Sequence, residues 1–182
     1  METLLLMGMT KNNNSSNYKL HEFLGSEEER QELLLVYLEF FNRSKPLDFK
    51  YKTLSEKKHK HDHHFKYLTE QTKIFSASKN GKLIGFISFD IELKTLELPN
   101  TLEQIINRKQ TCEFVFAASR DFDWSLFRQA VFDIFQLIKV KYNVKYIAGN
   151  VRRKYKKKQF IAIAQKLFKF QFIEDFAYHA IP

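Results

Sequence analysis

The stretch that decides the fold is residues 111–141, TCEFVFAASRDFDWSLFRQAVFDIFQLIKVK. Residues 111–118 are rich in β-branched and aromatic side chains, which predicts a short buried strand. From residue 123 to residue 141 apolar residues recur at steps of three and four, which predicts an amphipathic helix. Asp123 or Ser125 can serve as its N-cap, because both side chains accept hydrogen bonds from the free amides of a first helical turn.

The chain after this helix repeats the same alternation. A second strand is predicted over 145–151, a second helix over 160–168 and a last strand over 170–178. Strand and helix alternating in this way favour an α/β fold. This order is also typical of half-domains that bind phosphorylated cofactors, which place the phosphate at the first helix N-terminus.

A hairpin is predicted upstream. Apolar runs over 72–78 and 82–92 flank Asn80-Gly81. Asn-Gly is the strongest short hairpin signal, because a type I′ turn needs positive φ at both central residues. Before the hairpin, residues 18–24 alternate like a strand.

A further helix is predicted to open at Ser26. Ser26 and Glu29 have the spacing of a capping box, and apolar residues then recur through Phe41 until Pro46 ends the helix. The basic, polar segment between this helix and the hairpin is expected to be irregular.

This order of elements resembles the GNAT acyltransferase superfamily over roughly residues 18–178. The hairpin KIFSASKNGKLIGFISFDIE is similar to that family's second and third strands, and EFVFAASRDFDWSLFRQAVFDIF is similar to its fourth strand and third helix. The resemblance implies one domain over 18–182, with a mixed, mostly antiparallel sheet and helices on both faces. It also implies acetyl transfer from acetyl-coenzyme A to an amine or hydroxyl acceptor.

The family binds the coenzyme A pyrophosphate at the turn after its fourth strand, which reads Arg or Gln, two residues, Gly, one residue, then Gly or Ala. Here Arg120 keeps the first position, but Asp123 and Ser125 replace the two small residues. A carboxylate about 4 Å from a phosphate costs several kcal/mol at an effective dielectric near 20. By resemblance, the residues that face the donor are Arg120, Phe122, Asp123, Trp124, Ser125, Arg152, Arg153 and Lys158.

Acyl transfer also needs a base to take a proton from the acceptor. The cluster HKHDHH at 59–64 lies where the family builds its acceptor wall, and a histidine titrates near neutral pH, so His61 and His63 are candidate bases. Glu113, on the fourth-strand candidate, lies where some relatives place a base; strand alternation alone makes it an exposed strand residue. No metal site is expected, because the cluster also reads as a polar tract and offers no evident third ligand.

The basic run at 152–158 leaves other functions open. Six of its seven residues are lysine or arginine, within a chain of net charge +9. The run could contact coenzyme A phosphates, bind nucleic acid through counterion release, or form a solvated loop. Because the glycines of the pyrophosphate turn are missing, a non-catalytic binding or structural module with the same fold is the alternative to an enzyme.

Length and composition set the remaining expectations. A chain of 182 residues suits one domain with a substantial core. The single cysteine, Cys112, cannot form an internal disulfide, which favours a reducing, cytoplasmic compartment and a core role for its side chain. No apolar run approaches membrane-spanning length. Residues 1–17, which include the polar tract KNNNSSN, are expected to form a disordered tail.

Overall fold

The computed structural model describes residues 2–7, 18–44, 54–93, 107–120, 124–150 and 170–176. The chain divides into two compact units, each built from segments that are distant in sequence. One unit takes residues 1–15, 89–115 and 132–182, and the other takes 16–88 and 116–131. Strand β5 (Thr111–Ser119) and helix α4 (Trp124–Tyr142) begin in one unit and end in the other. The expectation of one domain over 18–182 therefore stays a prediction.

The unit of residues 16–88 and 116–131 is built on antiparallel strands. Strand β2 (Lys19–Glu22) pairs with β3 (Lys73–Lys79), which is followed by β4 (Lys82–Asp90) and then by the end of β5. Asn80 and Gly81 have φ of 51° and 75°. Both angles are positive, as a type I′ turn requires, so the predicted hairpin is confirmed.

Helix α1 (Glu27–Ser44) begins where the capping pattern predicts. The amide of Glu29 donates to Ser26 Oγ at 3.2 Å, which satisfies one free donor of the first turn. The Glu29 carboxylate accepts from the amide of Leu24 at 3.3 Å. This return bond ties the incoming chain to the helix and fixes the angle at which α1 leaves β2.

The segment expected to be irregular contains helix α2 (Leu54–Gln71), so that expectation is wrong. Its buried residues, His61, Phe65 and Leu68, follow steps of four and three and form one narrow stripe, while Lys58, Lys60 and Lys66 are exposed. Because the stripe is short and includes a histidine, the sequence did not show the apolar periodicity that would have predicted this helix. Packing of the stripe supplies the stability that the polar sequence does not.

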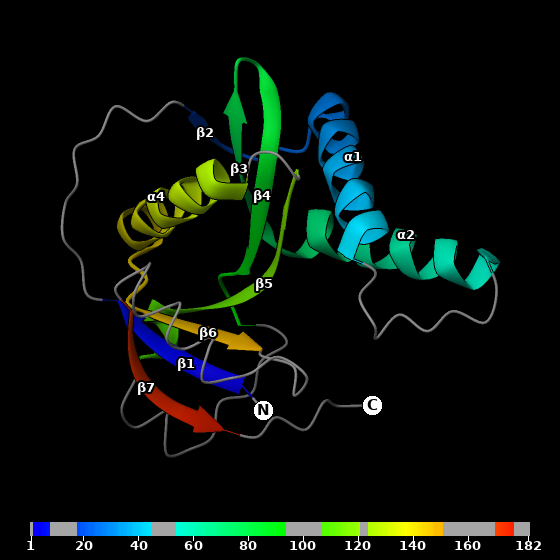
Figure 1. The fold of residues 1–182 in the computed structure, drawn as a ribbon. Coiled ribbons are helices and arrows are strands. Elements are labelled where there is room, and N and C mark those ends of the chain that lie inside the picture. The colour runs from blue at the N-terminus through cyan, green and yellow to red at the C-terminus, as the bar shows by residue number, and fades with distance from the viewer. Residues whose placement is uncertain are drawn as a thin grey trace. The chain divides into compact units, whose positions relative to one another are not determined.

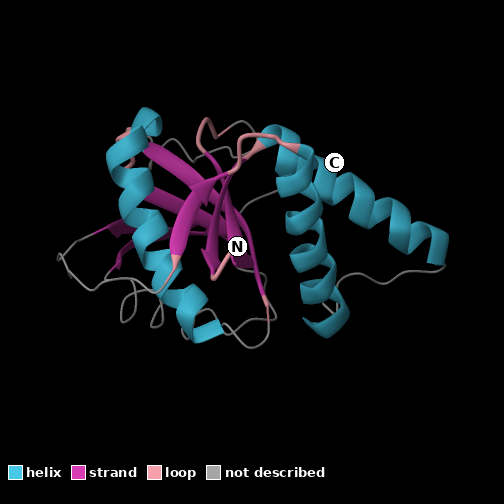
Figure 2. Cartoon of the chain, turned by 90° about the horizontal axis from the view of Figure 1, so that it is seen from above, coloured by secondary structure: helices cyan, strands magenta, loops and turns pink. Residues whose placement is uncertain are grey.

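Helices cover both faces of the strands in this unit. Figure 2 shows α1 and α2 on one side of the sheet and α4 on the opposite side. On the α4 side, close packing depends on Gly85 of β4. A Cβ atom at this position would lie 2.5 Å from ring carbons of Phe127 and 2.8 Å from the carbonyl oxygen of Ala118. The glycine therefore lets the helix approach the strand.

The other unit combines parallel and antiparallel pairs (Figure 1). Its strand order is the start of β5, then β6 (Tyr146–Asn150), β1 (Glu2–Met7) and β7 (Phe170–Phe176). Strand β1 pairs antiparallel with both β6 and β7. The expected disordered tail over 1–17 is thus wrong for Glu2–Met7, while residues 8–17 lie outside the described part of the chain. The predicted helix at 160–168 lies outside it as well.

Strands β5 and β6 run parallel, but only over a short register. It extends from Thr111↔Tyr146 to Phe114↔Gly149. A 3₁₀ turn, η1 (Arg108–Gln110), leads into β5, and its Gln110 carbonyl accepts from the amide of Lys145. After Phe114, β5 continues to Ser119 without a recorded partner in β6. In the described part of the chain, no helix combines the length and the apolar character needed to cross a membrane.

Replacing Gly85 with alanine tests the close contact of β4 with α4. We expect Gly85→Ala to lower the free energy of unfolding by about 1–3 kcal/mol, because a methyl group would overlap the Phe127 ring. Urea denaturation measures this change. In a Phe127→Leu background the same substitution should cost less, and equal costs in both backgrounds would contradict the proposed overlap.

Candidate functional site

The residues expected to face the donor are only partly described. Trp124 and Ser125 form the first residues of α4, so the predicted helix start after the turn is confirmed at the backbone level. The remaining expectations for the phosphate end, except Arg120, lie outside the described residues: Phe122, Asp123, Arg152, Arg153 and Lys158.

Arg120 is held by neighbouring protein groups. Its backbone amide donates to the carbonyl of Ile84 at 2.9 Å, and its Nε donates to the carbonyl of Leu83 at 2.8 Å. A guanidinium nitrogen also lies 3.2 Å from a carboxylate oxygen of Glu39 on α1. These bonds fix the end of β5 against β4 and α1. The side chain thereby has a structural role, and its contact with a donor stays a prediction.

The histidine cluster on α2 separates into inward and outward side chains. His61 is 6 % exposed and His64 is half-buried, whereas His59 and His63 are exposed on the outer face. Of the two histidines predicted as bases, the structure therefore places His61 in the interior and His63 on the surface. His64 belongs to the predicted cluster, but it was not singled out as a base. Its step of three from His61 would have indicated a shared face only if the segment had been recognised as a helix.

The two inward histidines share one partner, Tyr37 of α1. The Tyr37 hydroxyl lies 3.2 Å from Nδ1 of His61 and 2.9 Å from Nδ1 of His64. Tyr37 is fully buried, with 0 % of its surface exposed. We call these three side chains the His61–Tyr37–His64 triad.

Aromatic rings enclose the triad. Phe41 packs edge-on against His61, with ring centroids 4.6 Å apart, and stacks on Phe116 at 5.7 Å and an interplanar angle of 3°. His64 lies edge-on to Phe116 at 5.3 Å. Phe116 belongs to the part of β5 beyond its register with β6. The triad thus lies beside the part of β5 that extends past its register with β6.

The shared phenol restricts the protonation of the two imidazoles. A phenol has one proton to donate, so it can donate to only one of the two Nδ1 atoms. At least one imidazole must therefore carry a proton on Nδ1 and donate it to the phenol oxygen. When that ring is neutral, its lone pair is on Nε2. The triad accordingly holds at least one imidazole as a base at Nε2.

Glu113, the other candidate base, belongs to the unit of residues 89–115. It is half-buried on β5 and lies in register with Ala148 of β6, within the paired part of the strand. Its neighbour Cys112 is fully buried. Burial, followed by the negative charges of Asp90 and Glu113, raises the pKa of the Cys112 thiol above its ordinary value. A protonated, enclosed thiol is a core side chain, as expected from the sequence.

The described residues do not form a metal centre. Across the described segments, no three or more histidine, cysteine, aspartate or glutamate side chains are grouped so that they could hold an ion. His59 and His63 share a helical face at the i, i+4 spacing, but both project from the exposed side of α2.

The buried thiol predicts a pH dependence of stability. The folded protein keeps the Cys112 proton at pH values where the unfolded chain loses it, so this contribution to stability is complete below about pH 9 and decreases as the pH rises further. Urea denaturation of the parent and of Cys112→Ala, from about pH 8 to pH 10, measures it. The parent should lose more stability than the variant over this range. Parallel losses would contradict the assignment.

Comparisons with known proteins give a likeness in structure. The sequence matches no protein-family model, and no curated protein sequence matches it. Among solved structures, a possible acetyltransferase from Clostridium difficile superposes with a TM-score of 0.56 at 10% identity, covering 91% of this chain and 99% of that one.

Two further structures agree. A ribosomal-protein-alanine N-acetyltransferase from Brucella melitensis superposes with a TM-score of 0.55 at 11% identity, covering 91% of this chain and 98% of that one. An aminoglycoside 6'-N-acetyltransferase from Acinetobacter haemolyticus gives 0.54 at 12% identity, covering 90% and 98%. The chain therefore has the α/β fold of the GNAT acyltransferases, with a mixed sheet and helices on both faces, as the order of its elements predicted.

Proposed function

We propose that this chain transfers an acetyl group from acetyl-coenzyme A to an amine or hydroxyl acceptor, with the His61–Tyr37–His64 triad as the proton acceptor. The observation that carries the proposal is the Tyr37 hydroxyl shared by two imidazole Nδ1 atoms at 3.2 and 2.9 Å. This arrangement holds one imidazole with a basic Nε2. After that imidazole takes a proton, the phenol links it by hydrogen bonds to the second imidazole, so the positive charge can move to the second ring.

The part of β5 beyond its register with β6 suits the thioester end of the donor. A thioester carbonyl needs an N–H donor as negative charge develops on its oxygen during attack. Strand β5 continues from Phe114 to Ser119 beyond its register with β6. Alternate amides of an extended strand point to opposite edges, so part of this stretch presents donors away from β4. Phe116, which contacts His64 and Tyr37, belongs to the same stretch.

The reaction then balances as follows. The acceptor nitrogen or oxygen attacks the thioester carbon, so that a bond forms to the acceptor and the carbon–sulfur bond breaks. The acceptor's proton passes to Nε2 of a triad imidazole, the departing thiolate takes up a proton from solvent, and the imidazolium later releases its proton to solvent. The triad can hold the transferred proton, because an imidazolium donates from both ring nitrogens.

The triad is favoured over Glu113 as the base. Glu113 lies in register with β6, while Tyr37 and His64 contact the part of β5 past that register. His63 is disfavoured because its side chain is exposed on the outer face of α2. At the phosphate end, Asp123 and Ser125 stand where the resemblance implies small residues, so we expect a donor affinity lower than a glycine turn would give. Arg152, Arg153 and Lys158 are proposed to offset this loss in part.

Calorimetric titration of acetyl-coenzyme A, followed by an assay for released coenzyme A thiol with a panel of amines, tests the proposal. We expect saturable donor binding. His61→Gln and His64→Gln should each lower kcat by about 10²–10⁴-fold while donor affinity changes little, because the base acts on the acceptor. His63→Gln and His59→Gln, on the exposed face of the same helix, are the matched controls.

The outcomes separate the candidate functions. The absence of donor binding at millimolar concentration would contradict the enzyme and favour a non-catalytic module with this fold. If the donor binds but Glu113→Gln abolishes turnover and the triad variants retain it, the donor assignment stands and the base assignment is wrong. Unchanged donor affinity in each variant also shows that the protein is folded.

A further inference from the structure

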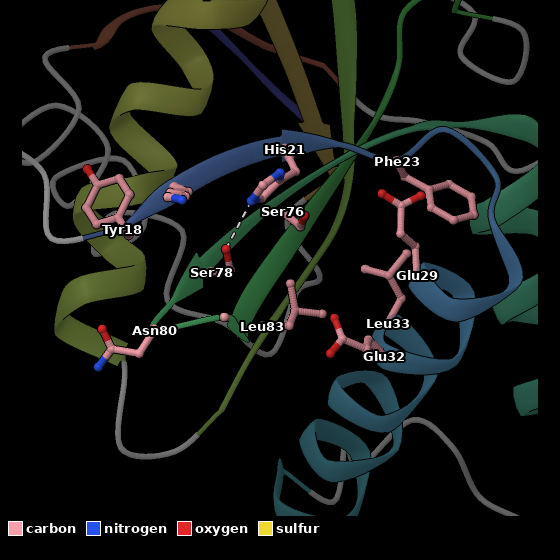
Figure 3. Close-up of a pocket in the computed structure, with 12 residues that line it drawn as sticks. Tyr18, His21, Phe23, Glu29, Glu32, Leu33, Ser76, Ser78, Asn80 and Leu83 are labelled. Carbon is pink, nitrogen blue, oxygen red and sulfur yellow. Dashed lines mark hydrogen bonds between the residues drawn. The ribbon is translucent and has the colours of Figure 1, made fainter.

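A pocket separate from the triad opens between β2, β3, the start of β4 and the first turns of α1 (Figure 3). Its volume is about 670 Å³. This size lies within the usual range of small-molecule sites. All of its lining residues belong to the unit of residues 16–88 and 116–131.

The strand register forms the floor of the pocket. Lys19 pairs with Ser78 and His21 pairs with Ser76, so these four side chains share one face of the sheet. His21 Nε2 lies 3.0 Å from Ser78 Oγ, a contact drawn in Figure 3. The contact with His21 therefore uses part of the hydrogen-bonding capacity of Ser78.

Ser76 is the second serine, and its hydroxyl is available. The residue is only 9 % exposed and lines the pocket. Among the residues that the structure describes, its hydroxyl has no hydrogen-bond partner. The oxygen atom itself is accessible from the pocket, because the described side-chain atoms that are both enclosed and without a partner belong to Arg43 and Ser88. Ser76 can therefore exchange a hydrogen bond with a polar ligand in the pocket.

Two carboxylates define the charge of the opposite wall. Glu29 and Glu32 line the pocket from α1, and their spacing of three residues places them on the same helical face. One Glu29 oxygen accepts from the amide of Leu24, and Glu32 has no recorded partner among the described residues. Lys19 is the only lysine or arginine that lines this pocket in the described chain. The α1 wall therefore favours a cation.

Aromatic side chains complete the lining. Tyr18 and Phe23 lie at opposite ends of β2, and Figure 3 shows Phe23 next to the Glu29 carboxylate. An aromatic face attracts an ammonium group and packs against the apolar face of a small ring. Carboxylates, hydroxyls and rings together suit a compact ligand that carries one ammonium group and several hydroxyls.

We propose that this pocket binds a hydroxylated primary amine of amino-sugar size, with its ammonium group beside Glu29 and Glu32 and a hydroxyl on Ser76. Binding here needs no acyl donor. The proposal therefore stands or fails independently of the transferase function, and it is tested without coenzyme A.

The test titrates glucosamine into the full-length, ¹⁵N-labelled protein and follows the amide resonances of His21, Ser76 and Ser78. N-acetylglucosamine, which lacks the positive charge, is the matched ligand control. We expect glucosamine to shift these resonances saturably, with an affinity at least tenfold higher than that of N-acetylglucosamine, as for a charged hydrogen bond.

Variants locate the binding. Glu32→Gln and Ser76→Ala should each weaken glucosamine binding by roughly three- to tenfold. Glu28→Gln, an exposed glutamate of the same helix that does not line the pocket, should leave it unchanged. Glu29 is left intact because it also holds the chain before α1. Thermal unfolding verifies that each variant is folded.

Three results would overturn the proposal. The first is no shift at tens of millimolar glucosamine, and the second is equal binding of both sugars, which would remove the role of the charge. The third is glucosamine binding that is insensitive to both Glu32→Gln and Ser76→Ala, which would place the ligand elsewhere on the protein.

Discussion

One phenol hydroxyl contacted by two imidazoles is the constraint on which the candidate chemistry depends. Tyr37 comes from α1, and His61 and His64 come from α2, so the hydroxyl also joins the two helices. Because the phenol can donate only one hydrogen bond, Nδ1 of His61 and Nδ1 of His64 cannot both be acceptors. A basic Nε2 is the consequence. Stacked phenylalanine rings then hold the triad against strand β5.

The candidate chemistry and the donor's phosphate site make separate demands on the chain. The proposed base and thioester site depend on the packing of the triad and on the geometry of β5 past its register with β6. Phosphate binding needs free amides and an open turn, and there Asp123 and Ser125 replace the small residues. The proposed base and the proposed donor site can therefore be tested separately.

Local signals predicted much of the fold. The Asn80-Gly81 turn, the Ser26 cap and the strand and helix over 111–141 follow from backbone and capping preferences that act within a few residues. The site was less accessible, because its members meet only through tertiary packing. His64 meets Tyr37 only because residues 54–71 form helix α2. The polar composition of that segment did not indicate a helix. Strand β1 was missed because its pairing with β6 and β7 is long-range.

The most direct test of the central claim is the protonation state of the two imidazoles, measured by long-range ¹H–¹⁵N NMR correlation at a pH where both are neutral. The account predicts that at least one of His61 and His64 carries its proton on Nδ1, and that Tyr37→Phe removes this preference. If both rings in the parent protein carry their proton on Nε2, the phenol does not join them as described, and the proposed base has no structural origin.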